Sequence, residues 1–288
     1  MRSLPTILIF SVISLCSFSS DKILYGEDDR VEADSFYAYE YWSQKDAVAG
    51  MVEKDRLWEF KGYLNFEYIS LETLGVQGSA SFLKQPLLPT CSGFLISDEL
   101  LVTASHCIKD KKDCDSHYWF FDYSLDKAKD FRFKKEDAYS CKEIVKTKFL
   151  PEEGIDFTVI RLDKKVLDRE PLKFRSSGKI SNDQELVMIG HPLGLPKKVT
   201  KNGYVWHNDS THFFSANLDA YSGNSGSPVL NAQTKEVEGI LVRGSQDFED
   251  QDDGTMTVNI CVEGDRREEC LYGEDITRIT SLGLEKLL

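Results

Sequence analysis

The sequence is poor in positive charge. Its 288 residues contain 35 lysines and arginines but 48 aspartates and glutamates, which gives a formal net charge of −13 at pH 7. A protein that binds the phosphate backbone of a nucleic acid needs clustered positive charge on its surface. The composition therefore argues against a nucleic acid partner.

The sequence also lacks an apolar run long enough to span a membrane. Its one candidate, LPTILIFSVISLCSF after Arg2, is followed closely by Asp21, and a spanning helix needs about 20 apolar residues. A positive charge, a short apolar run and the small residues Ser17 and Ser19 are instead typical of a cleaved secretory signal. We therefore predict that residues 1–20 are a signal peptide. The mature protein is then secreted or periplasmic, without stable membrane insertion.

Cysteine is scarce, with seven in the chain. Cys16 falls within the predicted signal, where Leu15 makes a lipidation site the weaker alternative. An even number of cysteines remains, which in an exported chain predicts disulfides. The sequence does not fix their pairing, and we expect neighbours to pair: Cys91 with Cys107, Cys114 with Cys141, and Cys261 with Cys270.

A zinc site is the alternative for part of this set. Cys107, Cys114 and His117 lie close together in the sequence, with a Cys-x2-His ending that is suited to zinc. Such a site needs a fourth ligand and reduced thiols, and export disfavours reduced thiols. We therefore predict no metal and no cofactor.

Strong helical periodicity is absent from most of the chain after residue 75. Short runs rich in Val, Ile, Phe, Tyr and Thr alternate with turn residues; they include CSGFLIS, LLVTA, HYWFFDY, IDFTVIRL, ELVMIG, THFFSA, VEGILVR and MTVNICV. A parallel sheet would need helical segments between such strands. The pattern predicts an all-β sandwich or a pair of barrels. Only the last stretch, EDITRITSLGLEKLL, has apolar residues at helical spacing and predicts a C-terminal helix.

Residues 21–75 show no strong period. They are acidic and aromatic, as in DKILYGEDDRVEADSFYAYEYWSQKD. This composition indicates an N-terminal arm that packs on the body of the protein, or a pro-segment. The sequence contains no internal repeat and no low-complexity linker.

No histidine follows the glycine-rich stretch DAYSGNSGSPVLN at residues 219–231. An α/β-hydrolase places its catalytic histidine after its serine, and its Gly-x-Ser-x-Gly elbow needs a glycine where Ser227 stands. That fold is therefore disfavoured. Glycine, serine and asparagine suit a simple turn, so Ser225 is a nucleophile only if a base and an orienting carboxylate lie elsewhere in the chain.

His106 and Asp156 fit these two roles. His106 ends CSGFLISDELLVTASHC, where a disulfide between Cys91 and Cys107 would fix the loop that carries the imidazole. A general base needs such fixing because it must lie within hydrogen-bond reach of the proton that it removes. Asp156 opens the apolar run in GIDFTVIRLD, where its carboxylate can be buried and aimed at a histidine nitrogen. An aspartate there is otherwise a turn residue.

The blocks TASHC, IDFTVIRL and GNSGSPV, in the order His, Asp, Ser, resemble the three catalytic blocks of chymotrypsin-like serine proteases. GNSGSP and ILYGEDDR are most similar to the bacterial glutamyl-endopeptidase (V8-like) and trypsin-like branch. The resemblance implies two antiparallel six-stranded β-barrels, one at residues 76–170 and one at 171–288. His106 and Asp156 would come from the first barrel and Ser225 from the second.

The resemblance also implies a mechanism. Ser225 would attack the substrate carbonyl, His106 would take its proton and return it to the leaving amine, and Asp156 would hold the imidazole in the useful tautomer. The backbone N–H groups of Gly223 and Ser225 would form the oxyanion hole. The implied partners are polypeptide substrates, and the expected oligomeric state is a monomer.

The resemblance implies that three residues bind the substrate: Asp219, Val242 and Gly244. Asp219, six residues before the nucleophile, matches the base of the specificity pocket in trypsin-like members, where a carboxylate favours Lys or Arg at the cleaved position. The alternative is a turn residue that points elsewhere. Glutamyl members read their substrate with a histidine where this chain has Leu241, so glutamate specificity loses its main support.

Asn224 departs from the trypsin pattern. In trypsin an aspartate precedes the nucleophile and pairs with the N-terminal amine on activation, and asparagine cannot supply that charge. Activation by this ion pair is therefore not expected. A non-catalytic binding protein on the protease fold is the remaining alternative, although every residue type that catalysis requires is present.

Overall fold

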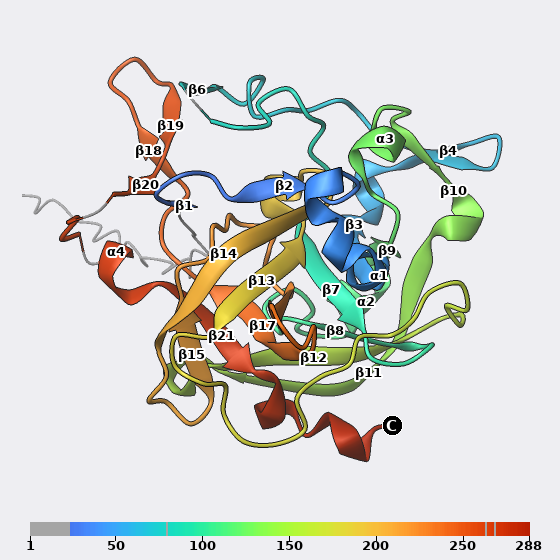
Figure 1. Ribbon diagram of the computed structural model, residues 1–288. Coiled ribbons are helices and arrows are strands. Elements are labelled where there is room, and N and C mark those ends of the chain that lie inside the picture. The colour runs from blue at the N-terminus through green and yellow to red at the C-terminus, as the bar shows by residue number, and fades with distance from the viewer. Residues whose placement is uncertain (1–23, 79, 263, 268) are drawn as a thin grey trace, which may run out of the picture.

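Antiparallel strands build most of the structure, as the sequence predicts. The computed structural model describes residues 24–78, 80–262, 264–267 and 269–288, and the predicted signal peptide lies outside them. The strands form two barrels that pack against each other (Figure 1). The prediction of two six-stranded antiparallel barrels is confirmed.

The first barrel is a closed ring of six strands. Its strand IDFTVIRL shows the underlying pattern, because every residue in it except Arg161 is buried. The largest side chains of the barrel core, Phe94, Trp119 and Phe157, have no exposed surface. In order around the ring, the strands are β11 (Tyr139–Leu150), β12 (Ile155–Leu162), β8 (Leu100–Thr103), β7 (Cys91–Leu95), β3 (Val48–Glu53) and β9 (His117–Phe120).

The second barrel closes because β13 pairs with β14 as well as with β16. A further short strand, β2, extends the sheet from β14. The core of this barrel includes Phe214, Leu241 and Ile276, which are buried completely or nearly so. In order, the strands are β13 (Glu185–Gly190), β16 (Pro228–Asn231), β17 (Val237–Arg243), β21 (Glu274–Arg278), β15 (Phe213–Ala216), β14 (Lys198–His207) and β2 (Arg30–Glu32).

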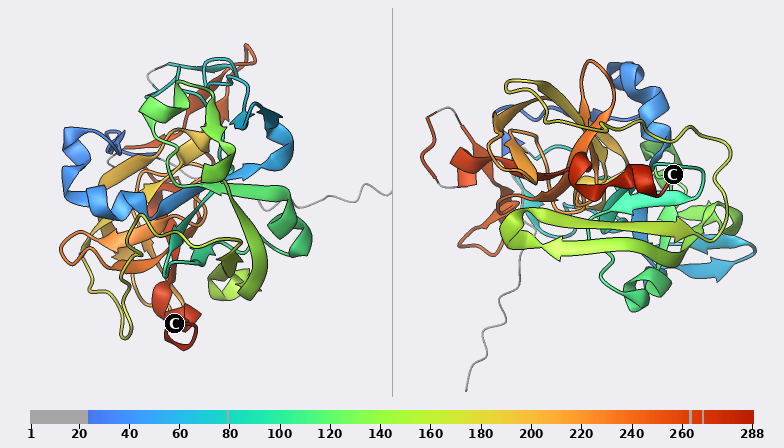
Figure 2. Two further views of the ribbon diagram at one scale, coloured as in Figure 1. Left: turned by 90° about the vertical axis from the view of Figure 1, so that its right-hand side faces the viewer. Right: turned by 90° about the horizontal axis from the view of Figure 1, so that it is seen from below.

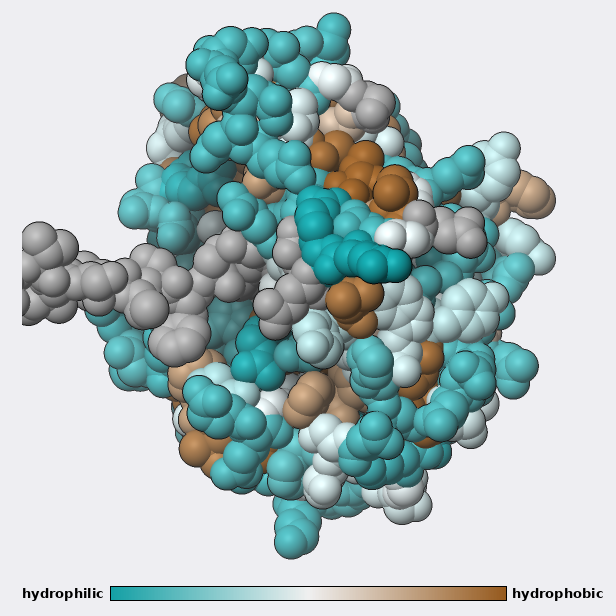
Figure 3. Space-filling view, turned by 90° about the vertical axis from the view of Figure 1, so that its left-hand side faces the viewer, coloured by the Kyte–Doolittle hydropathy of each residue, from teal (hydrophilic) through white to brown (hydrophobic). Residues whose placement is uncertain are grey.

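Three small sheets lie outside the barrels. One is a parallel pair of β1 (Leu24–Tyr25) and β20 (Ile260–Cys261). The second joins β10 (Arg132–Lys134), β5 (Tyr63–Asn65) and β4 (Trp58–Phe60), and the third joins β18 (Phe248–Asp250), β19 (Met256–Val258) and β6 (Val76–Gln77). Figure 3 shows the side of the molecule from which the β18–β19 hairpin projects, where a hydrophobic patch interrupts the hydrophilic surface.

Helices are short and connect the strands. The α-helices are α1 (Trp42–Asp46), α2 (Lys111–Ser116), α3 (Leu125–Ala128) and α4 (Glu269–Tyr272). The 3-10 turns are η1 (Phe36–Tyr41), η2 (Lys54–Arg56), η3 (Lys135–Asp137), η4 (Pro151–Glu153), η5 (Pro192–Gly194), η6 (Ile279–Leu282) and η7 (Leu284–Lys286). Across the described ranges, none of the helices has the length and apolar character to cross a membrane.

The structure corrects the predicted domain boundary at residue 76. Val48–Glu53 form β3, which pairs with β7 and β9 as a wall of the first barrel, and Arg30–Glu32 pair with β14 of the second. Residues 21–75 are therefore not a separate arm. The sequence did not reveal β3, because its first five residues are all buried. A strand that is buried on both faces shows no alternation of apolar and polar residues.

The predicted C-terminal helix is present only as the short turns η6 and η7. The five residues before them form β21, because the barrel pairs this segment with β15 on one side and β17 on the other. Lys146 of β11 donates a hydrogen bond from Nζ to the carbonyl of Leu282 at 2.5 Å. This contact holds the C-terminal turns against the long β11–β12 hairpin (Figure 2).

The six cysteines pair as predicted. Cys91 is bonded to Cys107, Cys114 to Cys141, and Cys261 to Cys270. The first two disulfides lie in the first barrel, and the third closes a peripheral loop that carries β20 and α4. The zinc alternative is not formed, because Cys107 and Cys114 belong to different disulfides.

The disulfide between Cys114 and Cys141 should contribute strongly to stability. It joins residues 27 apart in sequence, and loop-closure entropy gives a contribution of about 3.5 kcal/mol to the free energy of unfolding. Replacing both cysteines with alanine should lower the midpoint of urea unfolding accordingly. The matched variant Cys261→Ala/Cys270→Ala reopens a separation of only 9 residues and should lose less. A larger loss in this control would contradict the prediction.

Candidate active site

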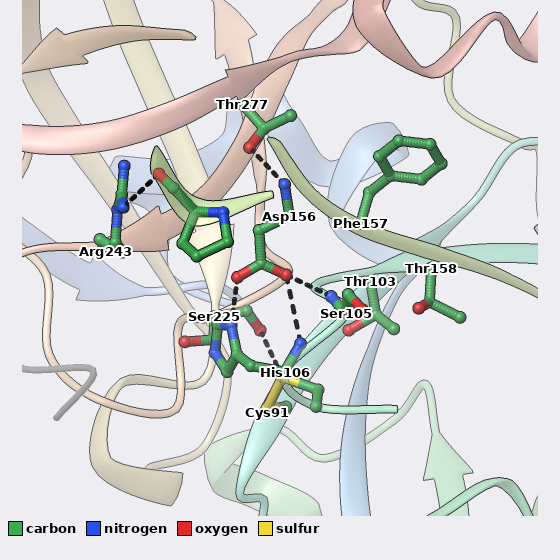
Figure 4. A network of polar contacts seen from close by, with 12 residues as sticks. Cys91, Thr103, Ser105, His106, Asp156, Phe157, Thr158, Ser225, Arg243 and Thr277 are labelled. Atoms are coloured by element: carbon green, nitrogen blue, oxygen red, sulfur yellow. Dashed lines mark hydrogen bonds and ion pairs between the residues drawn. A yellow bond between two sulfur atoms is a disulfide. The ribbon is translucent and has the colours of Figure 1, made fainter. Parts of the chain in front are cut away.

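The three residues predicted to act together lie at one place, where the two barrels meet (Figure 4). His106 follows β8, Asp156 is the second residue of β12, and Ser225 lies in the turn before β16. Two of them therefore come from the first barrel and one from the second. Figure 4 places Ser225 beside the imidazole of His106.

The imidazole of His106 is paired with the carboxylate of Asp156. Nδ1 of His106 lies 2.6 Å from Oδ2 of Asp156, and the Asp156 side chain is 6% exposed. Since an ionised carboxylate only accepts hydrogen bonds, this contact favours the tautomer in which Nδ1 carries the proton. Nε2 is then the basic nitrogen.

Backbone groups hold the Asp156 carboxylate in this orientation. Its Oδ1 accepts hydrogen bonds from the N–H of Ser105 at 2.6 Å and from the N–H of His106 at 3.2 Å. The N–H of Asp156 donates to Oγ1 of Thr277 at 3.3 Å, so β21 of the second barrel also fixes the position of this residue. A carboxylate held by several donors cannot rotate without breaking them all.

Nε2 of His106 makes no hydrogen bond within the described residues. The side chain of His106 is 23% exposed, in contrast to the buried Asp156. The ring is thus fixed on one side by its carboxylate partner, and its second nitrogen remains able to accept a proton.

Ser92, which the sequence analysis did not single out, fixes the backbone of Ser225. The N–H of Ser92 donates to the Ser225 carbonyl at 2.8 Å, and Oγ of Ser92 donates to the Gly223 carbonyl at 2.9 Å. Sγ of Cys107 also lies 3.8 Å from the Ser225 carbonyl. The only sequence signal was the position of Ser92 beside Cys91 in a strand-like run.

Gly226 shows how closely the barrels approach at this point. Its φ is +86°, and a Cβ there would lie 2.1 Å from the Ser92 carbonyl oxygen and 2.4 Å from Oγ1 of Thr103. Glycine is therefore required for both backbone angle and space. A larger residue would push the turn that carries Ser225 away from the first barrel.

Gly223 is one of the two residues predicted to supply an oxyanion donor. Its φ is +91°, and a Cβ would lie 2.5 Å from the His191 carbonyl oxygen. Within the described residues its N–H donates to no backbone carbonyl. A tight turn of this kind can direct successive N–H groups toward one negatively charged atom.

Asp219 does not present its carboxylate as the resemblance implies. The residue is only 2% exposed, and its Oδ1 and Oδ2 accept hydrogen bonds from the N–H groups of Tyr25 and Asp29, each at 2.7 Å. Its carboxylate therefore anchors the N-terminal segment to the second barrel. This arrangement agrees with the alternative reading of Asp219 as a residue that points elsewhere.

The other residues with predicted substrate-binding roles lie along β17. Val242 is 1% exposed, and Gly244 follows the end of the strand. Arg243, between them, donates to the Pro151 carbonyl at 2.7 Å and forms an ion pair with Asp275 at 3.0 Å. Its guanidinium charge is thus matched by a carboxylate within the protein.

Comparisons with known proteins agree with this architecture. Residues 91–240, which make up just over half of the chain, match a family model described as a trypsin-like peptidase domain. A solved structure of a Glu endopeptidase in complex with MPD is 14% identical, with a TM-score of 0.52, and the match covers 92% of this chain and 97% of that one. The VesB protease of Vibrio cholerae is 11% identical, with a TM-score of 0.51 and coverage of 90% and 66%. At these identities the two structures share the fold alone. No curated protein sequence matches the chain.

The environment of Asp219 predicts a pH effect on stability. Burial raises the pKa of Asp219 from 3.8 to about 7, although its two N–H partners act in the opposite direction. The folded state therefore binds this proton more tightly than the unfolded chain, and the contribution of Asp219 to stability falls as the pH rises from about 4 to about 7. Asp219→Asn should remove this dependence.

Melting temperatures of the wild type and Asp219→Asn across pH 4 to 8 check this prediction. The variant should be less stable at every pH because an amide cannot accept from both N–H groups. Its deficit relative to the wild type should shrink as the pH rises. A deficit that stays constant or grows would show that the pKa of Asp219 is not raised by folding.

Proposed function

We propose, from the premise that the chain belongs to the family of trypsin-like peptidase domains, that it is an exported serine endopeptidase with a triad of His106, Asp156 and Ser225. The observation that carries this proposal is the contact of 2.6 Å between Nδ1 of His106 and Oδ2 of Asp156. It supports a general base with a defined tautomer at the junction where Ser225 lies.

In the proposed mechanism, Oγ of Ser225 attacks the peptide carbonyl while Nε2 of His106 takes its proton. The C–N bond breaks as His106 returns the proton to the leaving amine, and an acyl-enzyme remains on Ser225. Water then attacks the ester, with His106 again as the base, and Ser225 recovers its proton. Asp156 stabilises the imidazolium that forms in each half of the reaction.

The backbone N–H groups of Gly223 and Ser225 would stabilise the negative charge on the carbonyl oxygen. The bonds that Ser92 makes to the carbonyls of both residues support this assignment. They hold the turn that carries Gly223 and Ser225 against the first barrel. A set of donors in fixed positions stabilises the developing oxyanion without reorganisation.

Export is supported by the disulfides. Three disulfides in a chain of this length fit an oxidising compartment, and the N-terminal sequence has the features of a cleaved signal. The proposal therefore places the mature enzyme in the periplasm or the medium.

We further propose a preference for Lys or Arg at the cleaved position. The net charge of −13 favours basic substrates. Glutamate specificity is the alternative, and the Glu endopeptidase among the similar structures makes it worth testing. Two features argue against it: Leu241 stands where a histidine would be needed, and Arg243 is already paired with Asp275.

Substitution of the triad tests the catalytic assignment. Ser225→Ala should abolish covalent labelling by a fluorophosphonate, because the reagent needs the serine oxygen as nucleophile. Asp156→Asn should keep the fold but reduce kcat by a factor on the order of 10⁴, since the imidazole would adopt the wrong tautomer. Labelling that persists in Ser225→Ala would refute the assignment, and folded wild-type protein that is never labelled would favour a binding protein.

Peptides that differ only at the cleaved position test the specificity. The purified mature protein should show the highest kcat/KM after Lys or Arg, and Ser225→Ala should remove this activity on every peptide. Preferential cleavage after Glu would leave the triad intact but establish the alternative specificity.

A further inference from the structure

We propose that Thr147 and Thr158, which the sequence analysis did not single out, are positioning residues for His106. They hold the loop that carries the imidazole through a chain of hydroxyl groups that all donate in one direction. The proposal rests on the proposed function, because it gives the two threonines a role in keeping the general base in place. Both act through His106, and neither is proposed to touch the substrate.

Strand β12 contacts this loop at two points. Asp156 and Thr158 lie two residues apart on β12 and therefore project from the same face of the strand (Figure 4). The carboxylate of Asp156 accepts from the N–H groups of Ser105 and His106, at the start of the loop. Oγ1 of Thr158 donates to the Ile108 carbonyl, at the end of the loop, at 2.9 Å. His106 is thus held between two fixed points.

Thr147 of β11 connects Thr158 to the start of the loop. The two threonines lie directly opposite each other in the β11–β12 hairpin, and their Oγ1 atoms are 2.8 Å apart. Oγ1 of Thr147 also lies 3.1 Å from Oγ of Ser105, the residue before His106. Three hydroxyl groups therefore link Ser105 to Ile108, one residue on each side of the imidazole and its disulfide-bonded neighbour.

The direction of this chain follows from the number of protons. A hydroxyl group has one proton to donate, and Thr158 donates its proton to the Ile108 carbonyl. The contact between the two threonines therefore uses the proton of Thr147, because its other acceptor, the Phe157 carbonyl, is more distant at 3.4 Å. Ser105 is then the donor to Thr147. Removing the hydroxyl of Thr158 takes a partner from both Thr147 and the Ile108 carbonyl.

Burial gives these contacts their effect on the loop. Thr158 and Ile108 have no exposed surface, and Ser105 is 3% exposed, so bulk water does not replace a lost partner. Thr147 is exposed as a residue, but its Oγ1 contacts the hydroxyl groups of the two buried residues. A buried carbonyl without a partner is costly, and the loop shifts to reduce this cost. Such a shift moves Nε2 of His106, on whose position proton transfer depends.

Isosteric variants break the chain at different points. Thr158→Val and Thr147→Val each replace one hydroxyl by a methyl group, and the second acts at the exposed position, where the change perturbs folding least. Thr158→Ser keeps the hydroxyl and is the conservative rescue variant. Tyr123→Phe is the matched control, because Tyr123 has no exposed surface and its hydroxyl donates to the Pro86 carbonyl at 2.8 Å. Melting temperatures confirm that each variant is folded.

We expect both valine variants to lower kcat about tenfold with KM nearly unchanged, because a misplaced base affects the transition state more than substrate binding. Thr158→Ser should recover most of the loss. Tyr123→Phe should lose stability, as Thr158→Val does, but keep the kcat of the wild type. Unchanged kcat in both valine variants, or an equal loss of kcat in Tyr123→Phe, would overturn the proposal.

Proton NMR of Nδ1–H of His106 tests the positioning without requiring catalysis. In the wild type the proton shared with Asp156 should give a low-field resonance, assigned by its loss in His106→Gln. The valine variants should broaden it through faster exchange with water, and Tyr123→Phe should not. This pattern in a protein that fluorophosphonate never labels refutes the peptidase assignment alone. A labelled wild type whose valine variants keep a sharp resonance refutes the role of the threonines alone.

Discussion

The hydrogen bonds of Ser92 hold the two halves of the candidate site together. Its N–H donates to the Ser225 carbonyl, and its carbonyl accepts from Oγ1 of Thr103. Its hydroxyl donates to the Gly223 carbonyl and accepts from the N–H of His191. Every polar group of this one buried residue is therefore used, and three of its four bonds cross to the second barrel. Because His106 and Asp156 belong to the first barrel, their geometry relative to Ser225 depends on this contact.

The sequence predicted those residues of the candidate site that lie in short sequence motifs. His106, Asp156 and Ser225 each lie in a short motif, and the order of the motifs matched a known pattern. Ser92 could not be found in this way, because its partners Gly223 and His191 are separated from it by 131 and 99 residues. A small polar residue in a strand carries no signal of its own, and its importance arises only when the barrels pack.

The sequence predicted the fold class, but it did not predict β3, the direction of the Asp219 side chain or the strand β21. The strands after residue 75 alternate with clear turns, whereas the first five residues of β3 are all buried, and this segment was expected to be an arm or a pro-segment. The direction of Asp219 depends on N–H groups 194 and 190 residues away, so spacing from the nucleophile could not reveal it. The last residues show helical spacing, yet pairing on both sides of β21 outweighs that local preference.

The disulfide between Cys91 and Cys107 makes the geometry of the candidate site depend on the redox conditions of the compartment in which the chain folds. It joins β7, which carries Ser92, to the loop that carries His106. In a reducing cytosol this bond does not persist, and the imidazole loop is left without its covalent anchor. With the export proposed above, the geometry of this loop would be completed only outside the cytosol. The same dependence makes an oxidising host compartment the natural choice for recombinant production.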